Sequence, residues 1–415
     1  MIANRIGRMA CCVVLAQLLV LCAAAQGAEP PARDAKKEKS IGRKIEAFSL
    51  RDHRDQTREL RDFADQKAIV VAFLGTECPL ARMYGPRLAA LAKELAPQGV
   101  AVVGVVSNVQ DSAEDVERYV KDCEISFPVL LDADCKLADQ FGATRTPEVF
   151  VLDAERVIRY RGRVDDQFGV GVKRPQIGRR DLAEAVTELL AGKPVSQAET
   201  EAAGCLIGRP KQVAADSSIT YSKDIAPILN ARCVICHREG EIGPFPLTSY
   251  EETIGWADTI VEVLDAGRMP PWFANPEHGK FLNDSRMSDK EKETFRAWAK
   301  NGCPPGDSAD LPPAREFPEG WSIPKPDLVI PMRAKPYHVP ATGVIGYQHF
   351  VADPGFTEDK WVVASEVRPG NRAVVHHVLI FLLGPGESAA MRMMSGELAG
   401  AYAPGAPPRL TPEGV

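Results

Sequence analysis

The sequence has no strongly basic region, and beyond its first residues it has no long apolar run. Its 415 residues carry a formal net charge of −6, and the one dense cationic run is Lys36-Lys37-Glu38-Lys39. This charge balance gives no electrostatic reason to expect a nucleic-acid partner. No later stretch supplies the roughly 20 apolar residues that a membrane-spanning helix needs. The chain is 45% hydrophobic and 26% charged, as globular proteins are, and its length predicts roughly two to four domains.

The N-terminus, residues 1–28, has the pattern of a secretory signal peptide. Arg5 and Arg8 precede the apolar run Met9–Leu21, and residues 23–28 are almost all small, as a cleavage site requires. An uncleaved membrane anchor is the alternative, and the small residues argue against it. We therefore expect an exported protein, periplasmic or otherwise extracytoplasmic, with no membrane span after removal of the signal.

The most specific motif is Cys233-Val234-Ile235-Cys236-His237, which has the Cys-x-x-Cys-His spacing of covalent haem c attachment. Two thiols must reach two vinyl groups of one macrocycle, and the histidine that follows must reach the iron. The alternatives are a zinc half-site and a thioredoxin-type redox pair. Zinc would need a second pair of ligands, and the nearby candidates, His278 and Cys303, are oddly spaced. We therefore expect a haem iron bound by His237.

Met269 is the candidate for the opposite axial ligand. It lies in the segment Gly267–Trp272, which Pro270 and Pro271 stiffen. Histidine and methionine together raise the potential of a haem and suit it for electron transfer. The structural alternative is a methionine packed in a core, and the alternative ligand is His278.

Helices are expected on both sides of this motif. Residues 221–232 have apolar side chains at helical spacing. Ser288 and Glu291 form a capping box for a second helix, which Gly302 ends. Residues 219–307 resemble the class I cytochromes c, and the resemblance is carried by Cys233, Cys236, His237 and Met269. It implies an all-α haem domain with His237 as the proximal ligand and Met269 as the distal one.

Residues 41–194 alternate between strand and helix patterns. Strands are expected at 68–74, 100–106, 127–131, 148–152 and 157–160. Helices are expected at 80–95, 112–121 and 181–191. This order predicts an α/β domain in which helices cover a sheet.

Cys78 lies where the first strong strand gives way to its helix. The free N–H groups and the dipole of a helix N-terminus lower the pKa of a thiol there and favour the thiolate. Thr146-Pro147, just before a strand, is typical of a cis-proline turn. With these features the domain resembles the redoxin and peroxiredoxin branch of the thioredoxin-like superfamily. The resemblance implies that Cys78 is the active thiol and that Pro147 packs against it.

Two positions depart from that family. Ala81 stands where thioredoxins have their second cysteine, which excludes dithiol exchange within the motif. Gly75 stands where peroxiredoxins have a threonine, and Thr76 is one residue further on. A distant resolving thiol would have to come from Cys123, Cys135 or Cys205. A structural role is favoured for the first two, and the alternative for Cys78 itself is an inert buried thiol.

Two linkers are expected between the modules. Residues 195–218 are rich in small and polar residues, and Gly204-Cys205 within them is a candidate to fold back on the first domain. Residues 308–326 are rich in proline and predict a stiff linker. Beyond it, 327–415 has short β-type runs at 327–330, 347–351, 360–364 and 374–383. Such runs between Gly/Pro turns are typical of an all-β sandwich.

His376 and His377 are adjacent in the last of these runs. Neighbouring strand residues point to opposite faces, so we expect one histidine to be exposed or the strand to bulge. Imidazoles suit copper, iron or zinc, and two histidines on an edge strand are the structural alternative. With residues 401–408 and 412–415, the pair resembles the copper type II, ascorbate-dependent monooxygenases, which implies a copper site. In that family a third histidine lies further on and a further domain binds the second copper, and His338 and His349 match no family position. We therefore expect an incomplete site and a C-terminally incomplete sandwich.

These observations predict an exported oxidoreductase of three modules: α/β thioredoxin-like, all-α cytochrome c and partial all-β sandwich. Its haem would carry electrons, and in a longer form it would deliver them to copper. One alternative is a thiol peroxidase or thiol–disulfide oxidoreductase that acts through Cys78. Another is a non-catalytic thioredoxin-like docking module attached to the haem. Redox proteins are the expected partners in each case.

Overall fold

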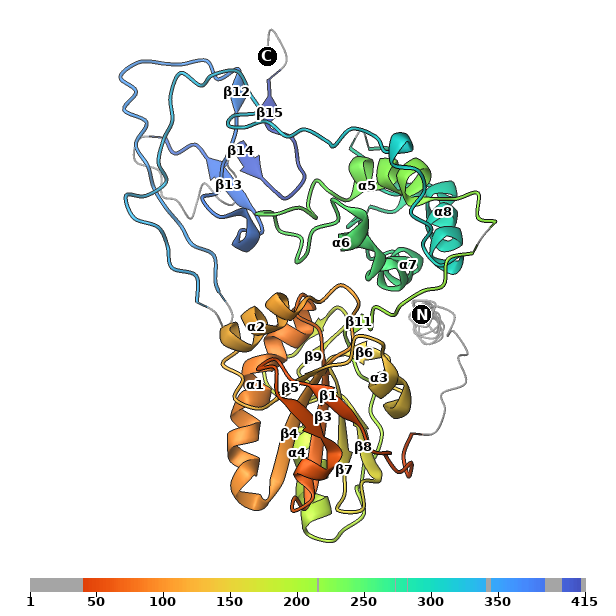
Figure 1. Ribbon diagram of the computed structural model, residues 1–415. Coiled ribbons are helices and arrows are strands. Elements are labelled where there is room, and N and C mark those ends of the chain that lie inside the picture. The colour runs from red at the N-terminus through yellow and green to blue at the C-terminus, as the bar shows by residue number, and fades with distance from the viewer. Residues whose placement is uncertain are drawn as a thin grey trace, which may run out of the picture. The chain divides into compact units, whose positions relative to one another are not determined.

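The computed structural model describes residues 40–214, 216–272, 274–281, 283–340, 345–384 and 398–411 (Figure 1). The predicted signal peptide, 1–28, lies outside the described residues, and so does 412–415 of the C-terminal resemblance. Within the described ranges, no helix has both the length and the apolar character to cross a bilayer.

A mixed five-stranded sheet forms the centre of the first domain. Its strands are β3 Ala68–Leu74, β4 Val100–Val106, β5 Val129–Leu131, β7 Glu148–Leu152 and β8 Ile158–Gly162. They lie in the order β5-β4-β3-β7-β8, with β3, β4 and β5 parallel and β7 antiparallel to both of its neighbours. Every residue of β3 is buried. Such continuous apolar runs are stable as strands because both faces of the sheet are covered.

Helices pack on both faces of this sheet, with the bounds α1 Pro79–Leu95, α2 Ala113–Asp122, α3 Lys136–Phe141 and α4 Asp181–Leu190. Alternate residues of β3 supply two separate cores. Val70 lies in one core with Leu88 of α1 and residues of α2 and α4. Phe73 lies in the other, with its ring centroid 5.5 Å from that of Phe141 in α3. The predicted α/β fold is confirmed, and α3 is the helix that the sequence pattern missed.

Three short strand pairs and two 3-10 turns complete this domain. The pairs are β1 Ser49–Arg51 with β2 Thr57–Glu59, β9 Phe168–Gly169 with β10 Val172–Lys173, and β6 Arg145–Thr146 with β11 Cys205–Leu206. The turns are Leu60–Phe63 and Ala96–Gln98. The pair β6–β11 joins the domain to a segment that follows α4.

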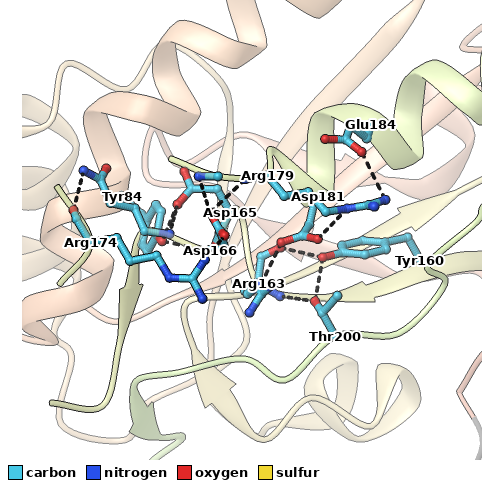
Figure 2. A network of polar contacts seen from close by, with 12 residues as sticks. Tyr84, Tyr160, Arg163, Asp165, Asp166, Arg174, Arg179, Asp181, Glu184 and Thr200 are labelled. Atoms are coloured by element: carbon cyan, nitrogen blue, oxygen red, sulfur yellow. Dashed lines mark hydrogen bonds and ion pairs between the residues drawn. The ribbon is translucent and has the colours of Figure 1, made fainter. Parts of the chain in front are cut away.

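That segment is the start of the predicted linker 195–218, and it is bound to the domain. The N–H of Thr200 donates to the carbonyl of Arg161 in β8 at 3.0 Å. Figure 2 shows the Thr200 hydroxyl between Tyr160 and Arg163. It lies 2.7 Å from the Tyr160 hydroxyl, and it accepts from the backbone N–H of Arg163 at 3.0 Å. The expectation that this segment folds back on the first domain is confirmed.

An ion pair extends the same network to α4, and a hydrogen bond extends it to α1 (Figure 2). Asp181, buried at the start of α4, accepts from Arg163 Nε at 2.7 Å. Asp165 accepts from the Tyr84 hydroxyl of α1 at 2.8 Å. These contacts hold the chain between β8 and α4, which includes Arg163, a residue that Thr200 contacts.

A second set of helices packs around a hydrophobic core of its own and is here called the second domain. Its elements are a π-helical turn Tyr221–Ile225, α5 Ala226–Arg232, α6 Tyr250–Ile254, α7 Ala257–Asp265 and α8 Asp289–Lys300, with 3-10 turns Pro276–His278 and Ser308–Asp310. α8 begins at the predicted capping box, in which the Ser288 and Glu291 side chains each accept the other's backbone N–H. The predicted helix 221–232 is confirmed, with the π-helical turn as its first part.

The C-terminal region has only short strands among its described residues. They are β12 Ala364–Ser365, β13 Val378–Phe381, β14 Leu398–Tyr402 and β15 Arg409–Leu410, beside a 3-10 turn Arg372–Val374. β12 pairs with β15, and β13 pairs with β14. The prediction of strands at 327–330 and 347–351 is wrong, because the structure has no strand there. Of the strand predicted at 360–364, only Ala364 lies in a strand. Apolar side chains of these runs are exposed, Val351 at 75% and Trp361 at 91%, so no facing surface stabilises a strand there.

Glu148 offers a test of the first domain. It forms a buried ion pair with Arg161, with Oε1 2.5 Å from Nη2 and side chains 3% and 6% exposed. Removing one partner of such a pair leaves an uncompensated charge and costs about 3–5 kcal/mol. We expect Glu148→Ala to destabilise the sheet by that amount, measured by hydrogen exchange of peptides from β3 and β7. Glu94→Ala is the control, because its exposed bridge to Arg180 contributes about 0–1 kcal/mol. Equal protection in the two variants would contradict the assigned role.

Candidate active site

Cys78 is the N-cap residue of the 17-residue helix α1 and lies four residues after the end of β3. Pro79 occupies the first helical position, where its missing N–H costs no hydrogen bond. Cys78 is 1% exposed, and the backbone N–H of Ala81 is one of the groups that lower the pKa of its thiol. The predicted position of this thiol, between a strand and its helix, is confirmed.

The Thr146–Pro147 peptide bond is cis, as predicted. The turn lies beside Cys78, whose Sγ–H donates to the carbonyl oxygen of Thr146 at 2.9 Å. Glu148 holds this turn, because its Oε2 accepts from two backbone N–H groups that precede the proline, at 2.8 and 3.3 Å. The buried ion pair with Arg161 therefore also fixes the backbone that faces the thiol.

Cys205 reaches the same place from a distant segment. β11 pairs antiparallel with β6, which sets Cys205 opposite Thr146. The thiols of Cys205 and Cys78 interact, and each shifts the pKa of the other. Gly204 permits this close approach: its φ is +143°, and a Cβ there would lie 2.0 Å from the carbonyl oxygen of Thr146. The site is a pair of free thiols beside a cis-proline turn.

Contacts on both sides hold Cys205 in position. The Arg145 side chain donates to the carbonyl of Gly204 at 2.8 Å. Beyond the cysteine, Ile207 is buried in the core that contains α3, and its N–H donates to the carbonyl of Thr144 at 3.0 Å. The position of Cys205 therefore depends on the backbone around it as well as on its own side chain.

The two thiols have opposite shifts in pKa. Burial raises the pKa of Cys78, but hydrogen bonds from the Cys205 thiol and from the backbone N–H groups of Ala81 and Cys205 outweigh it, so the net pKa is lowered. The hydrogen bond to Cys78 is the largest cause that raises the pKa of Cys205, and burial adds to it. Of the two thiols, Cys78 is therefore the one that loses its proton first as the pH rises.

Two carboxyl groups next to this cysteine were not predicted as site residues. Burial, with the charge of Asp111, raises the pKa of Glu77 to about 7. Burial also raises the pKa of Asp111, which accepts from the backbone N–H and the hydroxyl of Thr76 at 3.1 and 2.8 Å. Glu77 therefore exchanges protons near neutral pH at the start of α1. The one signal in the sequence was an acidic residue directly before the cysteine.

The other two candidate resolving thiols have different surroundings. Cys135 Sγ donates to the carbonyl of Ser107 at 3.0 Å, and Cys123 Sγ lies 3.9 Å from the carbonyl of Arg82. Both are buried, and burial raises the pKa of each. Of the three candidates, Cys205 is the one that contacts Cys78, and its neighbours favour a structural role for the other two.

The predicted haem ligands lie in the second domain. Cys233, Cys236 and His237 directly follow α5, and His237 Nδ1 lies 3.1 Å from the carbonyl oxygen of Phe245. This contact leaves Nε2 free to bind a metal, as such a hydrogen bond does in metal sites. The three residues therefore fit covalent haem on this side. Met269 follows α7, is 39% exposed and lies outside the buried core of the domain, and His278 is also exposed.

The predicted copper ligands lie just before β13 and not within a strand. The Nδ1 atoms of His376 and His377 are 2.9 Å apart, and the ring of Tyr347 lies 5.5 Å from that of His377. Across the described ranges there is no group of three or more His, Cys, Asp or Glu side chains that would hold a metal ion. Two imidazoles do not complete a copper site, so the described residues do not fit one.

The lowered pKa of Cys78 makes a testable prediction. An ordinary cysteine has a pKa of about 8.5, so Cys78 should keep its thiolate at pH values where ordinary thiols are protonated. The ultraviolet absorbance of the thiolate, taken as the difference between the wild type and Cys78→Ser, should fall at a lower pH than that value. Any stability that this ionisation contributes is present above the ordinary pKa and is lost as the pH falls through the lowered one. A midpoint at or above the ordinary value would contradict the assigned hydrogen bonds.

Comparisons with known proteins match the part of the chain that contains Cys78. The AhpC/TSA family matches residues 41–161. The thiol:disulfide interchange protein DsbE of Pseudomonas aeruginosa is 32% identical over 155 residues, which cover 36% of this chain and 77% of that protein. The thiol-disulfide oxidoreductase ResA of Bacillus subtilis is 32% identical over 108 residues, which cover 26% of this chain.

The chain spans 59% of the length of this ResA protein. A crystal structure of a hypothetical protein from Sinorhizobium meliloti is 33% identical, with a TM-score of 0.38, and the match covers 41% of this chain and 96% of that one. Through its first domain the chain belongs to the thioredoxin-like redoxin family of DsbE-type thiol:disulfide interchange proteins.

Proposed function

We propose that the chain is an exported thiol–disulfide oxidoreductase in which Cys78 is the attacking thiol. The observation that carries this proposal is the place of Cys78 at the N-terminus of α1, with its sulfur against the cis-proline turn. The lowered pKa favours the thiolate, which is the nucleophile in disulfide exchange. Similarity to DsbE and ResA supports the same reaction class. The predicted signal peptide favours exported redox proteins as partners.

The exchange step follows from the groups around the sulfur. The Cys78 thiolate attacks one sulfur of a partner's disulfide, a mixed disulfide forms, and the partner's other sulfur leaves as a thiolate. The N–H groups of Ala81 and Cys205 stabilise the attacking charge. The carbonyl oxygen of Thr146, at 2.9 Å, favours the protonated thiol instead. The site is therefore balanced between the two protonation states.

Peroxide reduction is less well supported than disulfide exchange. Peroxiredoxins carry a threonine where this chain has Gly75, and a Cβ at that position would lie 2.8 Å from Asn108 Nδ2 and 2.9 Å from Thr146 Oγ1. The Thr76 hydroxyl donates to Asp111 at 2.8 Å. Neither residue supplies the hydroxyl that the peroxidase reaction of that family uses.

Disulfide turnover tests the proposal. With dithiothreitol as the electron donor and a protein disulfide as the substrate, the full chain should accelerate reduction. Cys78→Ser should return the rate to the uncatalysed background, whereas Cys135→Ser, which removes a buried thiol of the same domain, should retain activity. Equal rates for the wild type and Cys78→Ser would instead support the reading of this domain as a docking module.

We also infer that the second domain carries haem c for electron transfer. The hydrogen bond between His237 Nδ1 and Phe245 favours this function, because it orients the imidazole and leaves Nε2 for iron. Cys233 and Cys236 would attach the porphyrin, which would supply one-electron chemistry when bound. The backbone of the motif is held by the N–H of Leu247, which donates to the carbonyl of His237 at 3.0 Å.

Covalent haem gives a direct spectroscopic test. Protein exported from a host with c-type haem maturation should show a pyridine haemochrome that survives acid-acetone extraction. The double variant C233A/C236A should lose the covalent signal because both thioether bonds need a thiol. Cys303→Ala is the control, since this thiol is buried in the core of the same domain and is not part of the motif. Protein with no covalent haem would contradict the inference.

A further inference from the structure

The motif around Cys78 has no second thiol, since Ala81 occupies that place, yet another cysteine contacts the sulfur. We propose that Cys205 is the resolving thiol of this site. It attacks the sulfur of Cys78 in the mixed disulfide and releases the reduced partner, leaving an internal Cys78–Cys205 disulfide. This inference rests on the proposed exchange reaction at Cys78. It assigns the second step to a residue outside the matched region 41–161.

Backbone geometry supports the assignment independently of the ionisation of the thiols. Cys205 lies opposite Thr146 in the β6–β11 pair, and residues opposite each other in such a pair have Cα atoms about 4.5–5.5 Å apart. The carbonyl of Thr146 is also the group that Cys78 Sγ contacts at 2.9 Å. One residue, Thr146, thus neighbours both cysteines.

The segment that carries Cys205 is held in place by specific contacts on both sides of the cysteine. Gly204 has a backbone conformation that other residues rarely adopt, and a Cβ on it would meet Thr146 O at 2.0 Å and Pro147 Cδ at 3.3 Å. Arg145 holds the carbonyl of Gly204, and Thr200 anchors the segment upstream. Ile207 anchors it downstream in the hydrophobic core. Contacts before and after Cys205 therefore position this residue beside the turn that Cys78 contacts.

The two steps balance in atoms and electrons. The partner's disulfide gains two electrons and becomes one thiolate and one thiol, while Cys78 and Cys205 lose two electrons and form one S–S bond; the thiolate then takes a proton from water. The proton of Cys205 leaves as its sulfur attacks and is available to the departing thiolate. A dithiol of another redox protein would reduce the internal disulfide again. Because Cys78 is 1% exposed, the groups around it must move before a partner can reach the sulfur.

A trapping experiment tests the assignment. The full chain is treated with bis(2-hydroxyethyl) disulfide, and each cysteine is followed by differential alkylation and peptide mapping. The wild type should yield a Cys78–Cys205 disulfide, whereas Cys205→Ser should accumulate the mixed disulfide on Cys78. Cys123→Ser, which removes another buried thiol of this domain, should behave as the wild type does.

The outcomes separate the two proposals. A mixed disulfide that persists on wild-type Cys78, or an internal disulfide to another cysteine, would overturn the role of Cys205 and leave exchange at Cys78 standing. The absence of any Cys78 product in both proteins would overturn the exchange reaction and the role of Cys205 together.

A second variant tests the backbone that delivers the thiol. Gly204→Ala places a Cβ against Thr146 O, so it should reduce the yield of internal disulfide while Cys78 still forms the mixed disulfide. Gly171→Ala is the control, because Gly171 also has a positive φ but its Cβ would meet open space. Equal yields from the two variants would show that the β6–β11 pairing does not position Cys205.

Discussion

The antiparallel pairing of β11 with β6 is the contact on which the candidate site depends. It brings a cysteine from the segment after α4 to the carbonyl of Thr146, the same group that receives the hydrogen bond from Cys78. Without that pairing, Cys205 would not lie beside the turn that Cys78 contacts. With it, two thiols lie at the same turn, and the more acidic of them, Cys78, lies at the helix N-terminus, where an attacking thiolate is best stabilised.

The rest of the domain keeps this contact in place. β3 is covered on both faces, so the junction at which Cys78 lies is fixed by two hydrophobic cores. Glu148, which forms an ion pair with Arg161, fixes the cis-proline turn by accepting from its backbone. The network around Thr200 holds the start of the returning segment. Buried ion pairs contribute little net stability compared with apolar packing, so their value here is in defining one geometry for the backbone around the thiols.

The α/β order, the place of Cys78 and the cis-proline turn could be read from the sequence because each has a strong local pattern: a buried apolar run, a proline after the cysteine and an X-Pro pair before a strand. The role of Cys205 could not be settled in the same way. Cys205 was one of three candidate resolving thiols, and the contact that distinguishes it is a pairing of two-residue strands, too short to leave a periodic signal. The raised pKa of Glu77 results from burial, which the sequence does not show.

In the second domain, the capping box of α8 and the helix before the haem motif were predictable for the same local reason. In the C-terminal region the same reasoning was wrong, because runs such as 347–351 have an apolar composition but no surface to pack against. Composition alone predicts a strand only when a partner exists to bury one of its faces. The paired imidazoles of His376 and His377 likewise form a contact with each other but not a metal site among the described residues.

The central claim is that Cys78 and Cys205 form one redox couple. The most direct measurement is an equilibrium titration of the full chain in dithiothreitol buffers of graded potential, with the redox state of each cysteine read by mass spectrometry. The account predicts that the peptides of Cys78 and Cys205 are oxidised together, in one two-electron transition that links them to each other. Two thiols that remain reduced across the series, or that titrate independently with different partners, would contradict it.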